Sequence, residues 1–364
     1  FAVSKNNAAV SNHLEYSDWN YYEPDKVTQL SRADWEGTCP KEYKDMTAPA
    51  SMLADLNGKY YEVKKDDDTS KIVFGANNGL KFYDLAFRDF DDPDWQKLID
   101  QMTIDECLGL LCYGGNEFRD IPSIGFIRGS FTENSGNGMQ SEMCDARVDA
   151  PWAVSKKDNN GHFYLELYAT APTVTSSFDP SLQFRMGEEV GLQALIVGLP
   201  ILWGPGLNTH RTAYNGRNGD YYSEGPILTG NTGMEFAIGA FKYGLLASPK
   251  HFAFNDQETN RGGVAPFMTE QRAREVELRA FQIPMEANKY DAKAPEYWNG
   301  EENHDFGMRG MMTSFSKIGG VECTASEGLI TDIAKNEWGF KGYAVTDIGD
   351  DVDLFAAVAN SGVT

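Results

Sequence analysis

The chain has 364 residues, of which 41% are hydrophobic and 12% aromatic, enough for one large α/β barrel or two ordinary domains. A formal net charge of −22 opposes binding to nucleic acids or anionic membranes through bulk electrostatics, whereas a neutral ligand such as a sugar is compatible with it. No run of about 18 apolar residues occurs, so we expect no membrane span.

Residues 1–90 are rich in Asp, Lys, Asn, Tyr and Trp and contain several turn clusters. Only Ala50–Leu56 has a helical pattern, so we predict an extended lead-in or connecting segment that packs on another domain. A small independent domain is the alternative, which the sparse apolar residues disfavour.

Five cysteines (Cys39, Cys107, Cys112, Cys144 and Cys323) lack paired metal-ligand spacing, and we expect Cys107 and Cys112 to be small buried apolar residues. The odd cysteine number and the lack of a recognisable signal peptide favour a cytoplasmic location.

Residues 91–364 alternate between short apolar runs and longer segments with helical spacing. The predicted strands are Ile124–Phe131, Pro172–Ser176, Leu199–Trp203, Tyr243–Ala247, Gly310–Ser314 and Gly342–Thr346. The predicted helices between and after them are Pro180–Val197, Gly230–Phe241, Thr269–Asn288 and Ser326–Trp338. Repeated βα units imply a parallel sheet, and their number favours a (β/α)8 TIM-like barrel over a doubly wound sheet. The chain ends before a convincing eighth strand, so we predict a barrel that lacks its last strand, with an acidic loop at Asn299–Phe306.

Polar side chains gather directly after the predicted strand Tyr243–Ala247, in the stretch Ser248–Arg261. In an α/β barrel the carboxyl ends of the strands form the active-site face. The adjacent Lys250 and His251, followed by amides and acids, suit a ligand with many hydroxyls, because each hydroxyl needs a donor and an acceptor. A solvated polar loop is the alternative for a run of this composition.

Similar clusters follow two other predicted strands. Asn208, His210, Arg211, Arg217, Asp220 and Glu224 follow Leu199–Trp203, among glycines that allow close approach of a ligand to the backbone. Asp347 follows Gly342–Thr346. A carboxylate held ionised by Lys250 and Arg211 fits the nucleophile of glycosyl transfer, and a helix cap or a loop anion is an equal alternative on position alone.

Nucleotide and metal chemistry have little support in the sequence. Neither GxxxxGK[ST] nor a GxGxxG after a strand occurs, and His162, His210 and His251 lack HExxH or a related spacing. We therefore expect no metal and no cofactor.

Four motifs in order resemble glycoside hydrolase family 3, the β-glucosidase and β-xylosidase family. They are Gly204–Arg211 with Gly216–Asn218 and Tyr222–Glu224, then Lys250–Arg261, Met312–Phe315, and Trp338–Asp347. The resemblance implies a retaining, exo-acting enzyme, most similar to a β-glucosidase, in which Asp347 forms a glycosyl-enzyme intermediate. It also implies that Arg211, Lys250 and His251 bind the terminal sugar, or glycone, and that Glu224, Glu258 and Arg261 support them. The loop Lys250–Arg261 lacks the His/Asp pair of the family's N-acetylglucosaminidases.

Three positions depart from the family pattern as the resemblance aligns it. Asn134 stands where the family has an aspartate that grips outer glycone hydroxyls, Phe315 replaces a tyrosine, and Ile348 replaces an aromatic residue. We expect all three to line the substrate site. The departures leave a β-xylosidase, or a catalytically weak sugar-binding relative, as alternatives.

The resemblance assigns the general acid/base to a separate α/β sandwich domain. One subset of the family has that domain ahead of the barrel, and Leu30–Gly37 resembles its connecting segment. We therefore expect the acid/base to come from a domain that precedes Phe1 or from a second chain. The partners expected are this domain and a β-linked glucoside or oligosaccharide, with a homodimer as an open alternative.

Overall fold

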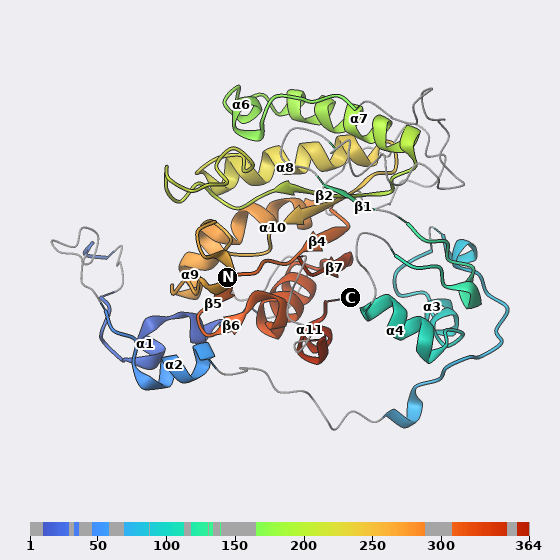
Figure 1. Ribbon diagram of the computed structural model, residues 1–364, viewed down its shortest axis with the longest axis horizontal. Coiled ribbons are helices and arrows are strands. Elements are labelled where there is room, and N and C mark those ends of the chain that lie inside the picture. Colours follow the sequence, from blue (N-terminus) through green and yellow to red (C-terminus); the bar gives the residue numbers. More distant parts are fainter. Residues whose placement is uncertain are drawn as a thin grey trace.

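The computed structural model in Figure 1 describes residues 10–28, 33–35, 46–57, 69–86, 88–112, 118–129, 131–133, 139, 165–287, 308–347 and 355–363. At its centre are parallel strands. β1 (Phe131–Glu133), β2 (Ile201–Gly206) and β3 (Leu246–Lys250) form one sheet in that order, and β4 (Gly310–Met312) pairs with β7 (Tyr343–Val345).

A parallel bridge between Phe252 and Thr313 joins the two sheets just beyond the ends of β3 and β4. The five strands therefore follow one another in space in the order of the sequence. Because all are parallel, their carboxyl ends meet at one edge, and this arrangement confirms the predicted α/β class with repeated βα units.

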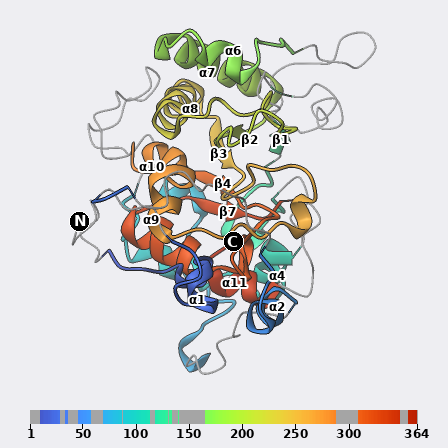
Figure 2. The same cartoon turned by 90° about the vertical axis from the view of Figure 1, so that its left-hand side faces the viewer.

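Helices cover one side of this sheet in two layers, with α8 (Pro226–Phe241) next to the strands and α7 (Pro180–Val197) outside it (Figures 1 and 2). Asp179 caps α7 by accepting a hydrogen bond from the Ser181 amide, and Gly198 ends the helix at φ 75°. The two helices approach closely because glycines on each helix lie against the backbone of the other helix. A Cβ atom on Gly239 would lie 2.1 Å from the Phe184 carbonyl oxygen.

The other elements are short. Before β1 lie η1 (Glu15–Ser17), α1 (Trp19–Tyr22), α2 (Ala50–Asn57), η2 (Thr69–Lys71), η3 (Phe82–Leu85), α3 (Asp94–Ile99), α4 (Ile104–Cys112) and η4 (Pro122–Ile124). After it lie α6 (Ala171–Thr175), η5 (Arg261–Gly263), α9 (Glu270–Arg272), the π-helix η6 (Ala273–Glu277), α10 (Arg279–Met285), the antiparallel pair β5 (Lys317–Ile318) and β6 (Val321–Glu322), η8 (Cys323–Ala325), the π-helix η9 (Gly328–Glu337) and α11 (Phe355–Ser361).

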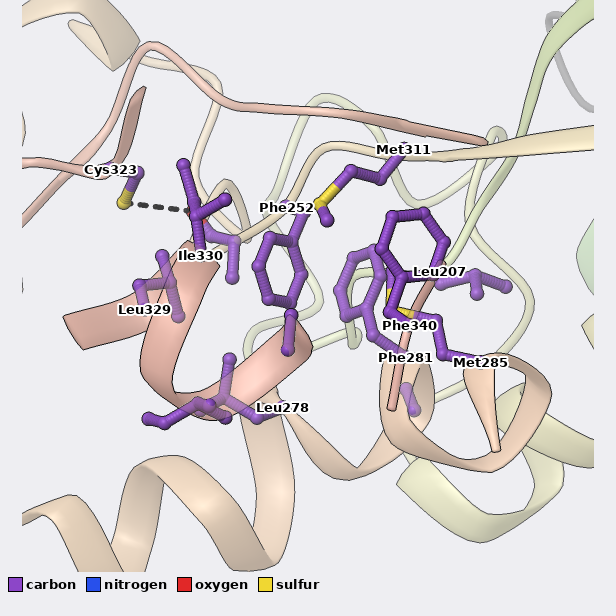
Figure 3. Close-up of a cluster of buried hydrophobic side chains, with 14 of the residues drawn as sticks. Leu207, Phe252, Leu278, Phe281, Met285, Met311, Cys323, Leu329, Ile330 and Phe340 are labelled. Carbon is purple, nitrogen blue, oxygen red and sulfur yellow. Dashed lines mark hydrogen bonds between the residues drawn. The ribbon is translucent and has the colours of Figure 1, made fainter. Parts of the chain in front are cut away.

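Among the described residues, the largest apolar cluster includes Phe252, two residues beyond β3, and Met311 of β4 (Figure 3). Phe252 is fully buried, and its ring makes edge-on contacts with Phe281 of α10 and with Trp338 just after η9. The Cys323 thiol, also buried, lies 3.5 Å from the Ala253 carbonyl oxygen. This packing holds the chain immediately after Lys250 and His251 in place.

The described part of the lead-in is fastened to the rest of the chain. Leu14 is fully buried in the main cluster, and both it and His13 donate backbone hydrogen bonds of 2.6 Å to the Glu270 carboxylate. Further along the lead-in, the Leu56 carbonyl oxygen accepts a hydrogen bond of 3.1 Å from the Lys317 side chain. Helix α2 confirms the helix predicted at Ala50–Leu56. The division at residue 90 stays a prediction.

Most predicted elements are confirmed with shifted ends, and α7 has the predicted bounds. The strand predicted at Pro172–Ser176 is wrong, because this segment forms α6. Its β-branched residues are typical of strands, but Pro172 lies in the first helical turn, where its fixed φ favours a helix. Most of Ile124–Phe131 is also not strand. Gly125 adopts φ 67° after a 3₁₀ turn, and β1 begins only at Phe131.

The single long helix predicted at Thr269–Asn288 is divided into α9, η6 and α10, and Pro284 lies inside α10. The expectation for the two cysteines is wrong for Cys112, which is exposed at the end of α4. Cys107 is half-buried and packs against the apolar cluster that contains Leu98 and Met102, so it meets the expectation in part. Cys39, Cys144 and the acidic loop Asn299–Phe306 lie outside the described residues.

Candidate active site

The ends of β2 and β3 place a buried lysine and histidine side by side. Lys250 is the last residue of β3 and is 1% exposed, and His251 follows at 3%. Asn208, just after β2, accepts a hydrogen bond from the His251 amide at 2.8 Å and donates one to the His251 carbonyl oxygen at 3.1 Å. Both backbone groups of His251 are thus satisfied, which fixes its position against the neighbouring strand.

The imidazole of His251 lies between a tyrosine and a carboxylate. Its Nδ1 is 3.2 Å from the Tyr221 hydroxyl, and its Nε2 is 3.6 Å from Oδ2 of Asp347. Burial, together with the positive charges of Arg217, Lys250 and Arg261, holds the pKa of His251 well below its usual value. The ring is therefore neutral at neutral pH.

Asp347 follows β7 by two residues, and its side chain is 12% exposed. It influences Lys250 across the strand ends. Burial lowers the pKa of Lys250 to about 8, and the negative charge of Asp347 opposes that lowering. A cation, an imidazole and a carboxylate from two strand ends therefore share one desolvated region.

Arg211 lies in the segment after β2 and is partly exposed. Its side chain is 43% exposed, its Nε pairs with Oδ2 of Asp256, and its Nη2 donates to Oε1 of Gln257 at 3.4 Å. Burial raises the pKa of Asp256, and Arg211 counteracts the rise. Asp256 and Gln257 thus hold one edge of the Arg211 guanidinium group.

A second buried carboxylate lies behind Asp256. Glu277 of η6 accepts hydrogen bonds of 3.1 Å from the Thr209 hydroxyl and from Arg272. Burial and, next, the charge of Asp256 raise the pKa of Glu277. Asp256 and Glu277 are thus two buried carboxylates, each paired with an arginine.

A chain of alternating charges crosses the other side of the site. The Arg261 guanidinium lies 4.7 Å from the centre of the Phe315 ring, and its Nη1 is 3.4 Å from Glu258. Glu258 is also 3.8 Å from Nη1 of Arg217, which in turn lies over the ring of Tyr221 at 5.4 Å. These contacts connect the Phe315 side of the site with the tyrosine that contacts His251.

The residues expected from the sequence thus differ in their surroundings. Arg211 follows β2, Lys250 and His251 lie at the end of β3, and Asp347 follows β7. Glu258 and Arg261 pair next to Phe315. Glu224 is exposed and forms no hydrogen bond or ion pair with any other described residue, so its expected supporting role stays a prediction. Asn134 and Ile348 lie outside the described residues.

Sequence reasoning missed Tyr221 and Glu277. Tyr221 lies in a stretch so polar that an aromatic residue there does not stand out. Glu277 did carry a signal, because at helical spacing it falls between Ala273 and Phe281 on the apolar face of the predicted helix. A carboxylate on such a face needs a buried partner.

Within the described ranges, no three His, Cys, Asp or Glu side chains are grouped so that they could hold a metal ion. In the same part of the chain, no helix is both long and apolar enough to cross a membrane.

Residues 132–294 match the family profile described as glycosyl hydrolase family 3 N terminal domain. This segment belongs to glycosyl hydrolase family 3. The matched segment contains Arg211, Lys250 and His251, which also belong to the motifs described above. Asp347 lies beyond its end.

Curated proteins similar to this chain include β-glucosidases. A "Beta-glucosidase" of Ruminococcus albus is 32% identical over 48% of the chain and 16% of the relative. "Thermostable beta-glucosidase B" of Acetivibrio thermocellus is 29% identical over 70% of the chain and 30% of the relative. The solved structure of β-glucosidase 3B from Thermotoga neapolitana, in complex with glycerol, aligns with a TM-score of 0.52 and 26% identity, covering 64% of this chain and 28% of that one. The chain thus spans less than a third of the length of these relatives.

Proposed function

We propose that the chain carries the glycone site and nucleophile of a retaining, exo-acting β-glycosidase, most similar to a β-glucosidase. The observation that carries the proposal is the convergence of Lys250, His251 and Asp347 at the ends of β3 and β7. β-Glucosidases among the relatives support the substrate class. The proposal includes a (β/α)8 TIM-like barrel in residues 91–364, with residues 1–90 as the connecting segment.

In this proposal an oxygen of Asp347 attacks the anomeric carbon while the bond from that carbon to the leaving-group oxygen breaks. The positive charge of Lys250 favours the ionised form of Asp347 that the attack requires. Water then attacks the same carbon and releases both the sugar and the Asp347 carboxylate. Retention of configuration follows from the two displacements.

The leaving oxygen needs a proton, and the attacking water must lose one. We assign both transfers to an acid/base group of an α/β sandwich domain, located elsewhere in the whole protein or in a second chain. Retaining enzymes place that group about 5 to 5.5 Å from the nucleophile.

Arg211, Lys250 and His251 are proposed to bind glycone hydroxyls, with Asn134, Phe315 and Ile348 lining the same site. Glu258 and Arg261 hold one another and the Phe315 face, which supports their role as positioning residues. Glu224 is proposed to support the loop after β2.

A covalent trapping experiment tests the nucleophile without the acid/base group. We would incubate the chain with 2,4-dinitrophenyl 2-deoxy-2-fluoro-β-D-glucoside, because dinitrophenolate leaves without being protonated and fluorine slows hydrolysis of the intermediate. Mass spectrometry is expected to find one fluoroglucosyl group on the peptide that contains Asp347. Asp347→Asn should not be labelled, whereas Asp332→Asn, a change in η9 beside His13, should be labelled as the wild type is. Labelling of another carboxylate would contradict the assignment of Asp347.

Two alternatives are separated by related measurements. A β-xylosidase should be labelled faster by the matching fluoroxyloside than by the fluoroglucoside. One observation favours the second alternative, a catalytically weak sugar-binding relative. The ring that contacts Arg261 is that of Phe315, and a phenyl ring offers no hydroxyl to the substrate. Such a protein should bind glucose and gluconolactone in calorimetry and yet fail to be labelled.

A further inference from the structure

Tyr221 is the fully buried neighbour of His251. It lies on the segment after β2, where it forms a parallel bridge with Gly206. A Cβ atom at residue 206 would lie 2.7 Å from the Tyr221 ring, so the glycine makes room for the ring. The rings of Tyr221 and His251 meet edge to face, with centroids 6.3 Å apart.

The Tyr221 hydroxyl has one proton and two acceptors within reach. It lies 3.2 Å from Nδ1 of His251 and 3.0 Å from the Asn255 carbonyl oxygen, and it accepts a hydrogen bond from the Asn255 side-chain amide at 3.2 Å. A neutral imidazole carries its proton on either Nδ1 or Nε2, and the group bonded to one nitrogen determines the state of the other. The direction of the Tyr221 hydroxyl is therefore coupled to the tautomer of His251.

The opposite side of the ring favours one of the two tautomers. Nε2 of His251 faces Oδ2 of Asp347 at 3.6 Å. With the proton on Nδ1, a lone pair of Nε2 would face a carboxylate oxygen in a desolvated site, which is repulsive. With the proton on Nε2, an N–H group faces the negative charge, and Nδ1 competes with the Asn255 carbonyl oxygen as the acceptor of the one Tyr221 hydroxyl proton.

We infer that Tyr221 is a positioning residue that holds His251 in the Nε2–H tautomer, so that the imidazole presents a donor toward Asp347 and the glycone. The inference rests on the proposed function only for its consequence in catalysis, because the tautomer itself is a property of the unliganded chain. The aromatic contacts alone do not select a tautomer. The hydroxyl adds a hydrogen bond at Nδ1 to the form that Asp347 favours, and Tyr221→Phe removes this hydrogen bond while it keeps the ring.

Nitrogen NMR with ¹⁵N-labelled histidine reads the tautomer directly, because protonated and unprotonated ring nitrogens of a neutral imidazole resonate in separate ranges. The chain has five histidines, and His251→Gln identifies the signals of His251 by their loss. At neutral pH, wild-type His251 is expected to show a protonated Nε2 and an unprotonated Nδ1. In Tyr221→Phe, where Nδ1 loses its donor while Asp347 still faces Nε2, an exchange-averaged mixture of the two tautomers is expected instead.

Tyr222→Phe is the matched control. Tyr222 is adjacent and equally buried, and its hydroxyl accepts a hydrogen bond from Gln183 at 2.8 Å instead of contacting His251. Its His251 spectrum should equal that of the wild type. A wild-type His251 protonated on Nδ1, or a Tyr221→Phe variant that keeps the Nε2–H form, would overturn the inference.

The trapping rate provides a second measurement. Loss of one hydrogen bond of about 1.4 kcal/mol predicts labelling of Asp347 that is about tenfold slower in Tyr221→Phe than in Tyr222→Phe. If neither the wild type nor any variant is labelled, the proposed function fails while the tautomer result stands. If the labelling rates of the two variants are equal although the tautomer changes, Tyr221 does not act on catalysis.

Discussion

Nε2 of His251 lies 3.6 Å from Oδ2 of Asp347, although the two residues follow different strands. The contact joins the loop after β3 to the loop after β7, across the intervening strand β4. Since Lys250 directly precedes His251, the contact brings Asp347, which is far away in the sequence, into the same desolvated environment as these two neighbours. The following predictions test the consequences of that arrangement and of the packing around it.

Lys250 should give the trapping reaction an alkaline limit. Its pKa of about 8 means that the charge facing Asp347 is lost as the pH rises through that value, so the labelling rate should fall above about pH 8. In Lys250→Arg the reaction should be slower overall, but the fall should disappear, because a guanidinium keeps its charge. A fall that persists in Lys250→Arg would assign it to another group.

The same lysine predicts the sign of a stability effect. Its folded-state pKa lies below the ordinary value of 10.5, so the unfolded chain binds more protons between about pH 8 and 10.5. The contribution of Lys250 to the free energy of unfolding should therefore increase as the pH rises through that range. Urea unfolding of wild type and Lys250→Met across the range should show this increase only in the wild type.

Asp256→Asn should weaken sugar binding with little loss of stability. The change removes the partner of Arg211 Nε, which leaves a half-exposed guanidinium less well held. It also removes the negative charge that raises the pKa of Glu277. We expect the dissociation constant for gluconolactone to rise roughly threefold to tenfold, equivalent to about 0.7 to 1.4 kcal/mol. Calorimetry measures the affinity, and an unchanged value would show that Arg211 does not need Asp256.

Arg274→Leu should loosen the lead-in. Arg274 donates hydrogen bonds of 2.6 Å to Glu270 and to Glu337, whose side chain is 2% exposed, and Glu270 holds the His13 and Leu14 amides. Removing the cation leaves two buried carboxylates without a permanently charged partner, so we expect a loss of about 3 kcal/mol in the free energy of unfolding. Lys97→Met, which breaks an exposed pair with Asp94, should cost less than about 1 kcal/mol in the same urea titration.

Gly239→Ala should separate α7 from α8, because the new Cβ would lie 2.1 Å from the Phe184 carbonyl oxygen. We expect destabilisation of about 2 to 3 kcal/mol. Gly109→Ala is the control, since a Cβ there has no atom within 4 Å and α4 gains a better helix former. It should be neutral or stabilising by up to about 1 kcal/mol, and equal melting temperatures for both variants would refute the packing argument.

The local sequence pattern was enough to predict the elements in which all local signals favour the same structure. Helix α7 has the predicted bounds because Asp179, Pro180 and Gly198 are start and stop signals that act within a few residues. The segment Pro172–Ser176 shows the limit, because its β-branched residues and its proline favour different structures. The positions of Lys250 and His251 at a strand end also followed from pattern, since a polar loop after an apolar run marks that end.

The sequence by itself determined which chemical groups lie at the strand ends, because alternation of apolar runs and polar loops is a local property. Only the tertiary structure decided their neighbours: Tyr221 against Nδ1 of His251, Asp347 against Nε2, and Glu277 behind Asp256. These contacts join segments far apart in the chain. They also set the lowered pKa values of Lys250 and His251, because the loss of solvent that shifts a pKa depends on everything packed around the group.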